Sequence, residues 1–270
     1  MILEVCAGSY SDCVNAYRGG ATRVELNSAL SLGGLTPSVA TLRNVKREMS
    51  LEVACMVRNR AAGFCYSNRE KIVMLEDTKI LLENGADAIV FGCLTKNREV
   101  DVEFVRKMVT VIHSFNKKAV FHKAIDVCEN YTSSIEKLIE CHVDRVLTSA
   151  QKRTVLEAKE EIKYIIDTYG EKIEILPGGS INIDNVSEIV NYTHTNQIHS
   201  SCKDFHQDHT TSYGVISYSY LDGTDNYECV SLIKVKELKK RLDNLKNRKM
   251  WKGTDLNVPF SYETVFNLDF

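Results

Sequence analysis

The sequence has few prolines, no Cys-x-x-Cys motif, no block of basic residues and no long apolar run. With three prolines in 270 residues and no low-complexity segment, nothing marks a linker between two domains. No apolar stretch reaches the ~18 residues of a membrane span, which argues against a membrane protein. No cluster of Lys and Arg is present and the net charge is −2, which argues against nucleic acid as a partner.

The nine cysteines form no zinc-type spacing, and their odd number argues against a complete disulfide framework. Two interpretations stay open: free thiols packed as small hydrophobic side chains, or one or two thiols near a cleft that bind a soft metal such as Cu(I). The first predicted strand begins at Ile2, which leaves no room for a signal peptide. We therefore expect a cytoplasmic protein.

Short runs of β-formers alternate with amphipathic stretches along the chain. Eight such units in about 250 residues predict one α/β domain, a closed (β/α)₈ barrel of the TIM type. A doubly wound open sheet is the alternative, and the absence of a visible break in strand order disfavours it. The predicted strands are Ile2–Cys6, Thr22–Leu26, Leu51–Val57, Asp87–Gly92, Lys118–His122, Asp144–Thr148, Ile173–Leu176 and Gln197–Ser200.

Two segments fall outside this alternation. The barrel is expected to span residues 1–249, with a long polar and aromatic excursion at 203–230 before the last helix. Loops of that length are typical of lids or of disordered insertions. Residues 250–270 form an aromatic tail, which we expect to dock on the barrel or on a partner subunit. The tail therefore predicts a homo-oligomer.

Polar residues interrupt strands that should be nearly all apolar when both faces are buried. Glu4 and Cys6 alternate with apolar neighbours in the first strand, and Glu25 follows the same pattern in the second. The fifth predicted strand supplies His122 and the eighth supplies His199. Since the apolar residues must face the helices, the polar ones should point into the barrel near its C-terminal end, where barrel enzymes keep their sites. An internal salt-bridge plug is the competing interpretation.

The seventh strand ends in Pro177-Gly178-Gly179-Ser180, and the eighth is followed by Ser201. In TIM barrels the loops after these two strands often bind phosphate through backbone N–H groups. Two glycines let the backbone approach an anion closely, although a tight turn alone can also require them. The sequence predicts an anion pocket there and leaves the simple turn as the alternative.

The residues at these positions carry a resemblance to a known family. The motifs are LEVC at the start, RGGATRVELNSALSLGGLTPS (18–38), MVRNRAAGFCYS (56–67), FHKAID (121–126), DRVLTSA (144–150) and LPGGSI (176–181). Together they resemble the CutC copper homeostasis family. The resemblance implies a TIM-type barrel, a cytoplasmic location, a role in copper homeostasis and Cu(I) as the bound metal. It brings no established enzymatic reaction.

One departure from the family pattern bears on copper. Many relatives have a second cysteine where this chain has Asn27, so a thiolate pair with Cys6 cannot form. Soft Cu(I) prefers thiolate, thioether or imidazole donors. We therefore expect Cys6 to be a ligand, with Met56, His199 and Cys202 as additional candidates.

The alternative function is a barrel enzyme that acts on a small anionic substrate, for example a phosphorylated one. In that hypothesis the anion is bound by a set of basic and loop residues: Arg58, Arg60, Gly178, Gly179, Ser180 and Ser201. Glu4, Glu25 or His122 would then carry out the acid–base chemistry. A third hypothesis, a scaffold acting through residues 250–270, depends on the tail alone.

Overall fold

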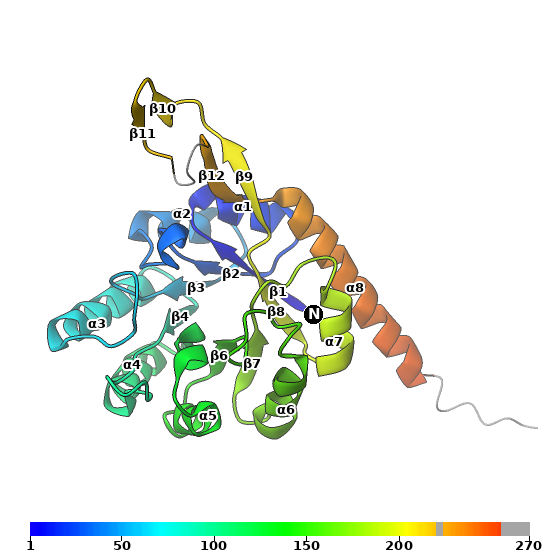
Figure 1. The fold of residues 1–270 in the computed structure, drawn as a ribbon. Coiled ribbons are helices and arrows are strands. Elements are labelled where there is room, and N and C mark those ends of the chain that lie inside the picture. The colour runs from blue at the N-terminus through cyan, green and yellow to red at the C-terminus, as the bar shows by residue number, and fades with distance from the viewer. Residues whose placement is uncertain (220–223, 255–270) are drawn as a thin grey trace, which may run out of the picture.

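The computed structural model describes residues 1–219 and 224–254, and its core is a ring of eight parallel strands (Figure 1). The strand order is β7-β6-β5-β4-β3-β2-β1-β8, so the chain runs around the ring in sequence and the last strand pairs with the first. The strands are β1 (Ile2–Ala7), β2 (Arg23–Leu26), β3 (Glu52–Met56), β4 (Ala88–Phe91), β5 (Lys118–Phe121), β6 (Arg145–Thr148), β7 (Glu174–Pro177) and β8 (Gln197–Ser200).

The seam between β7 and β8 completes the ring. A parallel bridge joins Gly178 to His199, and the side-chain amide of Gln197 donates a hydrogen bond to the carbonyl of Ile175 at 3.2 Å. The predicted (β/α)₈ barrel is confirmed. The alternative of a doubly wound sheet is wrong, because its strand order would reverse at a switch point and leave two open edges.

Helices alternate with the strands and cover the outside of the ring. They are α1 (Tyr10–Arg18), α2 (Val39–Glu48), α3 (Asn68–Glu83), α4 (Val102–Ser114), α5 (Tyr131–Glu140), α6 (Lys159–Tyr169), α7 (Val186–Thr193) and α8 (Leu232–Thr254), with short 3₁₀ turns at Leu30–Leu32 and Lys123–Val127. Ser67 and Glu70 form a capping box at the start of α3. Within the described ranges, no helix combines the length and the apolar character that a membrane crossing needs.

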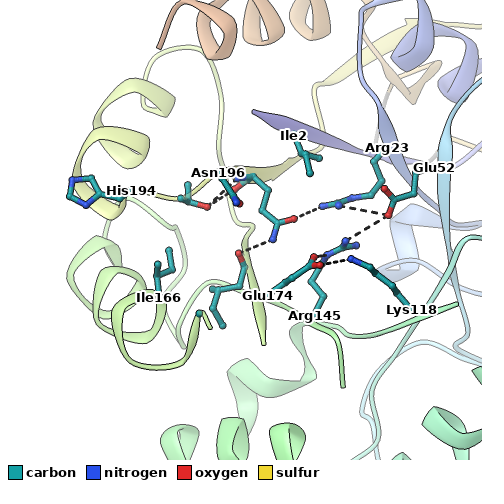
Figure 2. A pocket seen from close by; sticks show the side chains of 13 residues that line it. Ile2, Arg23, Glu52, Lys118, Arg145, Ile166, Glu174, His194 and Asn196 are labelled. Atoms are coloured by element: carbon teal, nitrogen blue, oxygen red, sulfur yellow. Dashed lines mark hydrogen bonds and ion pairs between the residues drawn. The ribbon is translucent and has the colours of Figure 1, made fainter. Parts of the chain in front are cut away.

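At the N-terminal end of the barrel, an ion-pair network lines a cavity of about 330 Å³ (Figure 2). Arg23 and Arg145 are each 1% exposed, and each is the first residue of its strand. Arg23 Nε pairs with Glu4 at 2.5 Å, and Arg145 Nε pairs with Glu174 at 2.7 Å. Glu52 lies 3.8 Å from Arg23 and 3.7 Å from Arg145. The competing interpretation of a salt-bridge plug therefore describes this lower layer.

Above this network the interior becomes apolar and then opens at the C-terminal end. Ala54, Met56, Ala88, Val90 and Val120 form a separate buried cluster inside the ring. The outward-facing strand residues belong to the larger core that the helices cover. The three layers inside the barrel are therefore ionic, apolar and, at the mouth, polar again.

The excursion between β8 and α8 is built largely of paired strands. β9 (Lys203–Gln207) pairs with β12 (Asn226–Val230) in an antiparallel ladder, and β10 (Ser212–Tyr213) pairs with β11 (Ile216–Ser217). Figure 1 shows these strands as an arm that extends beyond the C-terminal end of the barrel. Helix α8 continues through the first residues of the predicted aromatic tail, and residues 255–270 lie outside the described chain.

Gly178 lies where the barrel closes, and we expect its replacement by alanine to be destabilising. A Cβ at this position would lie 2.5 Å from Leu147 Cδ1 and 3.1 Å from His199 Cβ. Overpacking of this kind costs about 1–3 kcal/mol. Urea unfolding should show that loss for Gly178→Ala, whereas Gly63→Ala, whose Cβ would meet nothing within 4 Å, should change stability little. Equal stability of the two variants would contradict this assignment.

Candidate metal centre

A cavity of about 270 Å³ opens at the C-terminal end of the barrel, and we call it the mouth cavity. Its wall combines sulfur, carboxylate, imidazole and amide groups with a few apolar side chains. The lining residues are Cys6, Glu25, Asn27, Leu30, Gly33, Met56, Arg58, Phe64, His122, Lys123, Leu147, His199 and Glu228. Most of the residues that the strand pattern predicted to point inward therefore meet here.

Cys6, Glu25 and His199 place one potential ligand atom each within 4.8 Å of the others. Strand register brings them together. Cys6 is the partner of Glu25 across β1 and β2, and Glu4, which lies two residues before Cys6 on the same face, is the partner of His199 across β1 and β8. We call these three residues the mouth cluster. Its sulfur, oxygen and nitrogen donors are those that metals use in proteins.

His199 is oriented by the carboxylate of Glu4. Its Nδ1 lies 2.8 Å from Glu4 Oε1, so Nε2 is the nitrogen left for a ligand. Burial alone would raise the pKa of Glu4, but the hydrogen bond with His199 and the charge of Arg23 lower this pKa to about 2. Glu4 is therefore a carboxylate at neutral pH. A carboxylate bonded to the far nitrogen of a histidine is the usual support for a metal-binding imidazole.

The carboxylate of Glu25 is buried and only half satisfied. Its Oε2 accepts hydrogen bonds from Asn27 Nδ2 at 3.0 Å and from the Cys6 thiol at 3.6 Å. Its Oε1 has no hydrogen-bond partner in the described part of the chain. Burial raises the pKa of Glu25, and burial together with the charge of Glu25 raises the pKa of the Cys6 thiol. A bound cation would reverse both effects because it stabilises the deprotonated donors.

The remaining metal-ligand candidates divide between two places. Met56 lines the mouth cavity, and its role as a soft donor stays a prediction. Cys202 instead lines a separate cavity of about 480 Å³ between the loops after β7 and β8 and helix α8, and its thiol donates to Ser200 Oγ at 3.6 Å. Cys202 is therefore not part of the mouth cluster.

The predicted anion ligands are not brought into one site. The guanidinium of Arg58 donates to the carbonyls of Leu32, Gly33 and Gly34 at 3.0–3.1 Å and to Ala62 at 2.7 Å. Arg60 pairs with Glu70 at 2.6 Å and does not line the mouth cavity. Both guanidinium groups are thus bonded to the protein itself. They hold the loop after β3 in place.

The glycines after β7 pack tightly against neighbouring strands. Gly179 has φ +154°, and a Cβ there would meet Ser149 Cβ at 3.1 Å and Lys123 Nζ at 3.5 Å. Ser180 and Ser201 line the separate cavity with Cys202, together with Lys203 and Lys234. Close packing is by itself a sufficient physical reason for glycine at both positions. The alternative of a tight turn without a bound anion is therefore consistent with the structure. Anion binding near Ser180 and Ser201 stays a prediction.

His122 is a buried neutral histidine in the wall of the mouth cavity. Its Nδ1 accepts a hydrogen bond from the Ala124 N–H at 3.1 Å, so the ring proton is on Nε2, which has no partner among the described residues. Burial, assisted by the charge of Arg58, lowers the pKa of His122 to about 3. The ring lies 5.0 Å from that of Phe64.

This pKa predicts an acid-labile fold. In the unfolded chain His122 takes up a proton below its ordinary pKa of 6.5, whereas the folded chain resists it down to about 3. Stability therefore falls as pH decreases through this window, by up to about 1.4 kcal/mol per pH unit. Asparagine can accept the same backbone bond, so His122→Asn should unfold in urea with a shallower pH dependence below pH 6. Parallel pH profiles for the two proteins would contradict the argument.

Phe64, Lys123 and Glu228 line the mouth cavity, but the sequence analysis assigned none of them a role. Phe64 lies in a loop and packs its ring 5.2 Å from the Arg58 guanidinium. Lys123 follows β5 and donates to Ser149 Oγ at 2.8 Å. Glu228 comes from strand β12 of the arm and pairs with Lys203 at 3.6 Å. The hydrophobic alternation of the barrel strands could have found none of them, because all three lie outside those strands.

The fold and the site together define the class of protein: a TIM-type barrel whose C-terminal mouth brings together a thiol, a carboxylate and an imidazole. The CutC family model matches residues 1–204, and the chain belongs to this family. A CutC family protein of Treponema denticola is 47% identical over 197 residues, which is 73% of this chain and 79% of the relative. The human copper homeostasis protein cutC homolog is 36% identical over 202 residues, 75% of this chain and 73% of the relative.

A solved structure agrees with the family assignment. The crystal structure of CutC from Streptococcus agalactiae superposes with a TM-score of 0.70 at 29% identity, covering 74% of this chain and 98% of that protein. The family match ends at residue 204, shortly after β8. It therefore includes the mouth cluster and leaves most of the arm and all of α8 outside.

Proposed function

We propose that this protein is a cytoplasmic copper-handling protein that binds one Cu(I) at the mouth of its barrel through Cys6 and His199. The observation that carries the proposal is the register of β1, which places a thiol and an oriented imidazole in one small cluster. Met56 lines the same cavity and offers a thioether as a third soft donor. Asn27 stands in place of a second cysteine, so the imidazole of His199 takes the role of second donor.

The surroundings of the two donors support this assignment. Glu4 fixes the ring of His199 from the side away from the cavity, and Arg23 fixes Glu4 from below. Asn27 Nδ2 lies 3.6 Å from Cys6 Sγ and can donate a hydrogen bond to it. Such a donor stabilises a thiolate. All nine cysteines are free thiols, which suits the reducing cytoplasm. Homo-oligomer formation stays a prediction.

A second candidate function is an enzyme that acts on a small anionic substrate in the same cavity. The Nε2–H of His122 favours it, because a neutral imidazole that donates into a cavity can polarise a carbonyl oxygen. The hydrogen bonds that the two terminal nitrogens of Arg58 and the guanidinium of Arg60 already make within the protein weigh against it. Thermal stabilisation by inorganic phosphate or a polyol phosphate, abolished in His122→Asn, would support this candidate over the first.

Competition of the fully reduced protein with a chromophoric Cu(I) chelator tests the copper proposal. We expect one equivalent of Cu(I) to be withdrawn from the chelator, and His199→Gln to reduce the affinity by at least about tenfold. His209→Gln is the matched control, since His209 is exposed on the arm. Equal affinities of these two variants would show that His199 is not a copper ligand.

A further inference from the structure

Glu25 is the part of the mouth cluster that Cu(I) binding does not use. Carboxylate oxygen is a hard donor, whereas Cu(I) prefers thiolate, thioether and imidazole. Yet Glu25 is 4% exposed and its Oε1 has no hydrogen-bond partner in the described ranges. A buried carboxylate oxygen without a partner is costly. Its place beside Cys6 and His199 indicates a second kind of ligand.

We propose that the mouth cluster also binds a borderline divalent cation of the Zn(II) type through Cys6 Sγ, the carboxylate of Glu25 and Nε2 of His199. The inference rests on the same Cys6–His199 pair as the proposed function and adds Glu25 to it. Zinc takes thiolate, imidazole and carboxylate ligands together, at about 2.0–2.3 Å.

The distances fit this ion after a small adjustment. In a tetrahedral zinc site with those bond lengths, donor atoms lie about 3.3–3.8 Å apart. The three donor atoms here lie within 4.8 Å of one another, so movements of less than about 1 Å would bring them to bonding distance. Side-chain rotations of Cys6 and Glu25 can supply such movements without displacing the strands.

Charge also favours a divalent ion. Among the ion pairs of the described residues none involves Glu25. Arg58 lines the same cavity, but its two terminal nitrogens donate to four backbone carbonyls. A thiolate, a carboxylate and a neutral imidazole together carry two negative charges, which a divalent cation balances and Cu(I) does not. With three protein ligands, the usual four-coordinate shell of zinc keeps one position for a ligand from the cavity. The site is thus of the open kind that can hold an exogenous group.

The test titrates the metal-free, reduced full-length protein with ZnCl₂ against a chromophoric zinc indicator. We expect one equivalent to bind, and Glu25→Gln to weaken Zn(II) binding at least 100-fold and at least tenfold more than it weakens Cu(I) binding. Glu129→Gln is the matched control, because Glu129 is an exposed carboxylate that pairs with Arg98 and does not line the mouth cavity. Circular dichroism and unfolding in urea verify that each variant is folded.

Replacing zinc with cobalt tests ligation by Cys6 spectroscopically, without a variant protein. Co(II) in the wild-type protein should give a thiolate-to-cobalt absorption band, which reports ligation by Cys6. Failure of the wild-type protein to bind Zn(II), or equal Zn(II) affinity in Glu25→Gln and the wild type, would overturn the inference. Binding of Cu(I) without Zn(II) overturns this inference alone. Binding of Zn(II) without Cu(I) overturns the proposed copper function and leaves the divalent site standing.

Discussion

Replacing Cys6 with serine is expected to weaken Cu(I) binding by more than about 100-fold. Loss of groups that only support a ligand already costs about 10–100-fold in metal affinity, and Cys6 is the thiolate donor itself. Serine keeps the size of the side chain and its hydrogen bond to Glu25, so the fold should be retained. Chelator competition under reducing conditions measures the effect.

The control for Cys6 is Cys65→Ser. Cys65 is an exposed free thiol in the loop after β3, so it represents adventitious copper binding by an accessible cysteine. We expect Cys65→Ser to keep the wild-type affinity for the first equivalent of Cu(I). If Cys6→Ser and Cys65→Ser bind equally well, copper binding does not depend on the mouth cluster.

Replacing Arg23 with methionine is expected to lower the free energy of unfolding by about 3–5 kcal/mol. Arg23 is 1% exposed, pairs with Glu4 and donates to Gln197 Oε1 at 2.7 Å. Removing one partner of a buried ion pair leaves the other charge buried without compensation. Such a change typically lowers the free energy of unfolding by about 3–5 kcal/mol. Urea unfolding followed by circular dichroism measures it.

An exposed arginine pair supplies the comparison for Arg23. Arg47 pairs with Glu48 at 2.7 Å while both side chains are largely exposed, and such pairs contribute at most about 1 kcal/mol. Arg47→Met should therefore leave stability nearly unchanged. If Arg23→Met is as stable as Arg47→Met, the lower layer of the barrel does not depend on its ion pairs.

The barrel and the inward direction of its polar residues were predictable from the sequence. Alternation in β1 sets Glu4 and Cys6 against Leu3 and Val5, and both of these apolar residues are fully buried. The register between strands was not predictable. The pairing of Cys6 with Glu25, and of Glu4 with His199 across the closed seam, is decided by how the sheet closes, which no local pattern contains.

Groups outside the strands were the least predictable. Arg58 was expected to bind an anion, but its guanidinium is bonded by the carbonyls of the turn at Gly33 and Gly34. Carbonyl directions in a loop depend on backbone conformation, which residue types specify only weakly. Glu228 reaches the mouth cavity from the arm. The sequence of an exposed β-ribbon does not indicate which of its charged residues will line a cavity.

Glu4 connects the lower and upper layers of the barrel. One of its oxygens holds Arg23 and the other holds His199. We therefore expect Glu4→Gln to affect both layers, weakening Cu(I) binding by about 10–100-fold and lowering stability in urea. Glu174, which pairs with Arg145 in the lower layer only, is the matched comparison. Glu174→Gln should lower stability without changing Cu(I) affinity, and an equal loss of affinity in both variants would contradict the link through His199.

The site of copper binding can be located directly in a crystal. Anomalous diffraction at the copper edge, from crystals of the reduced protein grown with one equivalent of Cu(I), locates the metal directly. We expect one strong peak within bonding distance of Cys6 Sγ and His199 Nε2. A peak at Cys65 or another thiol, with none at the mouth, would contradict it.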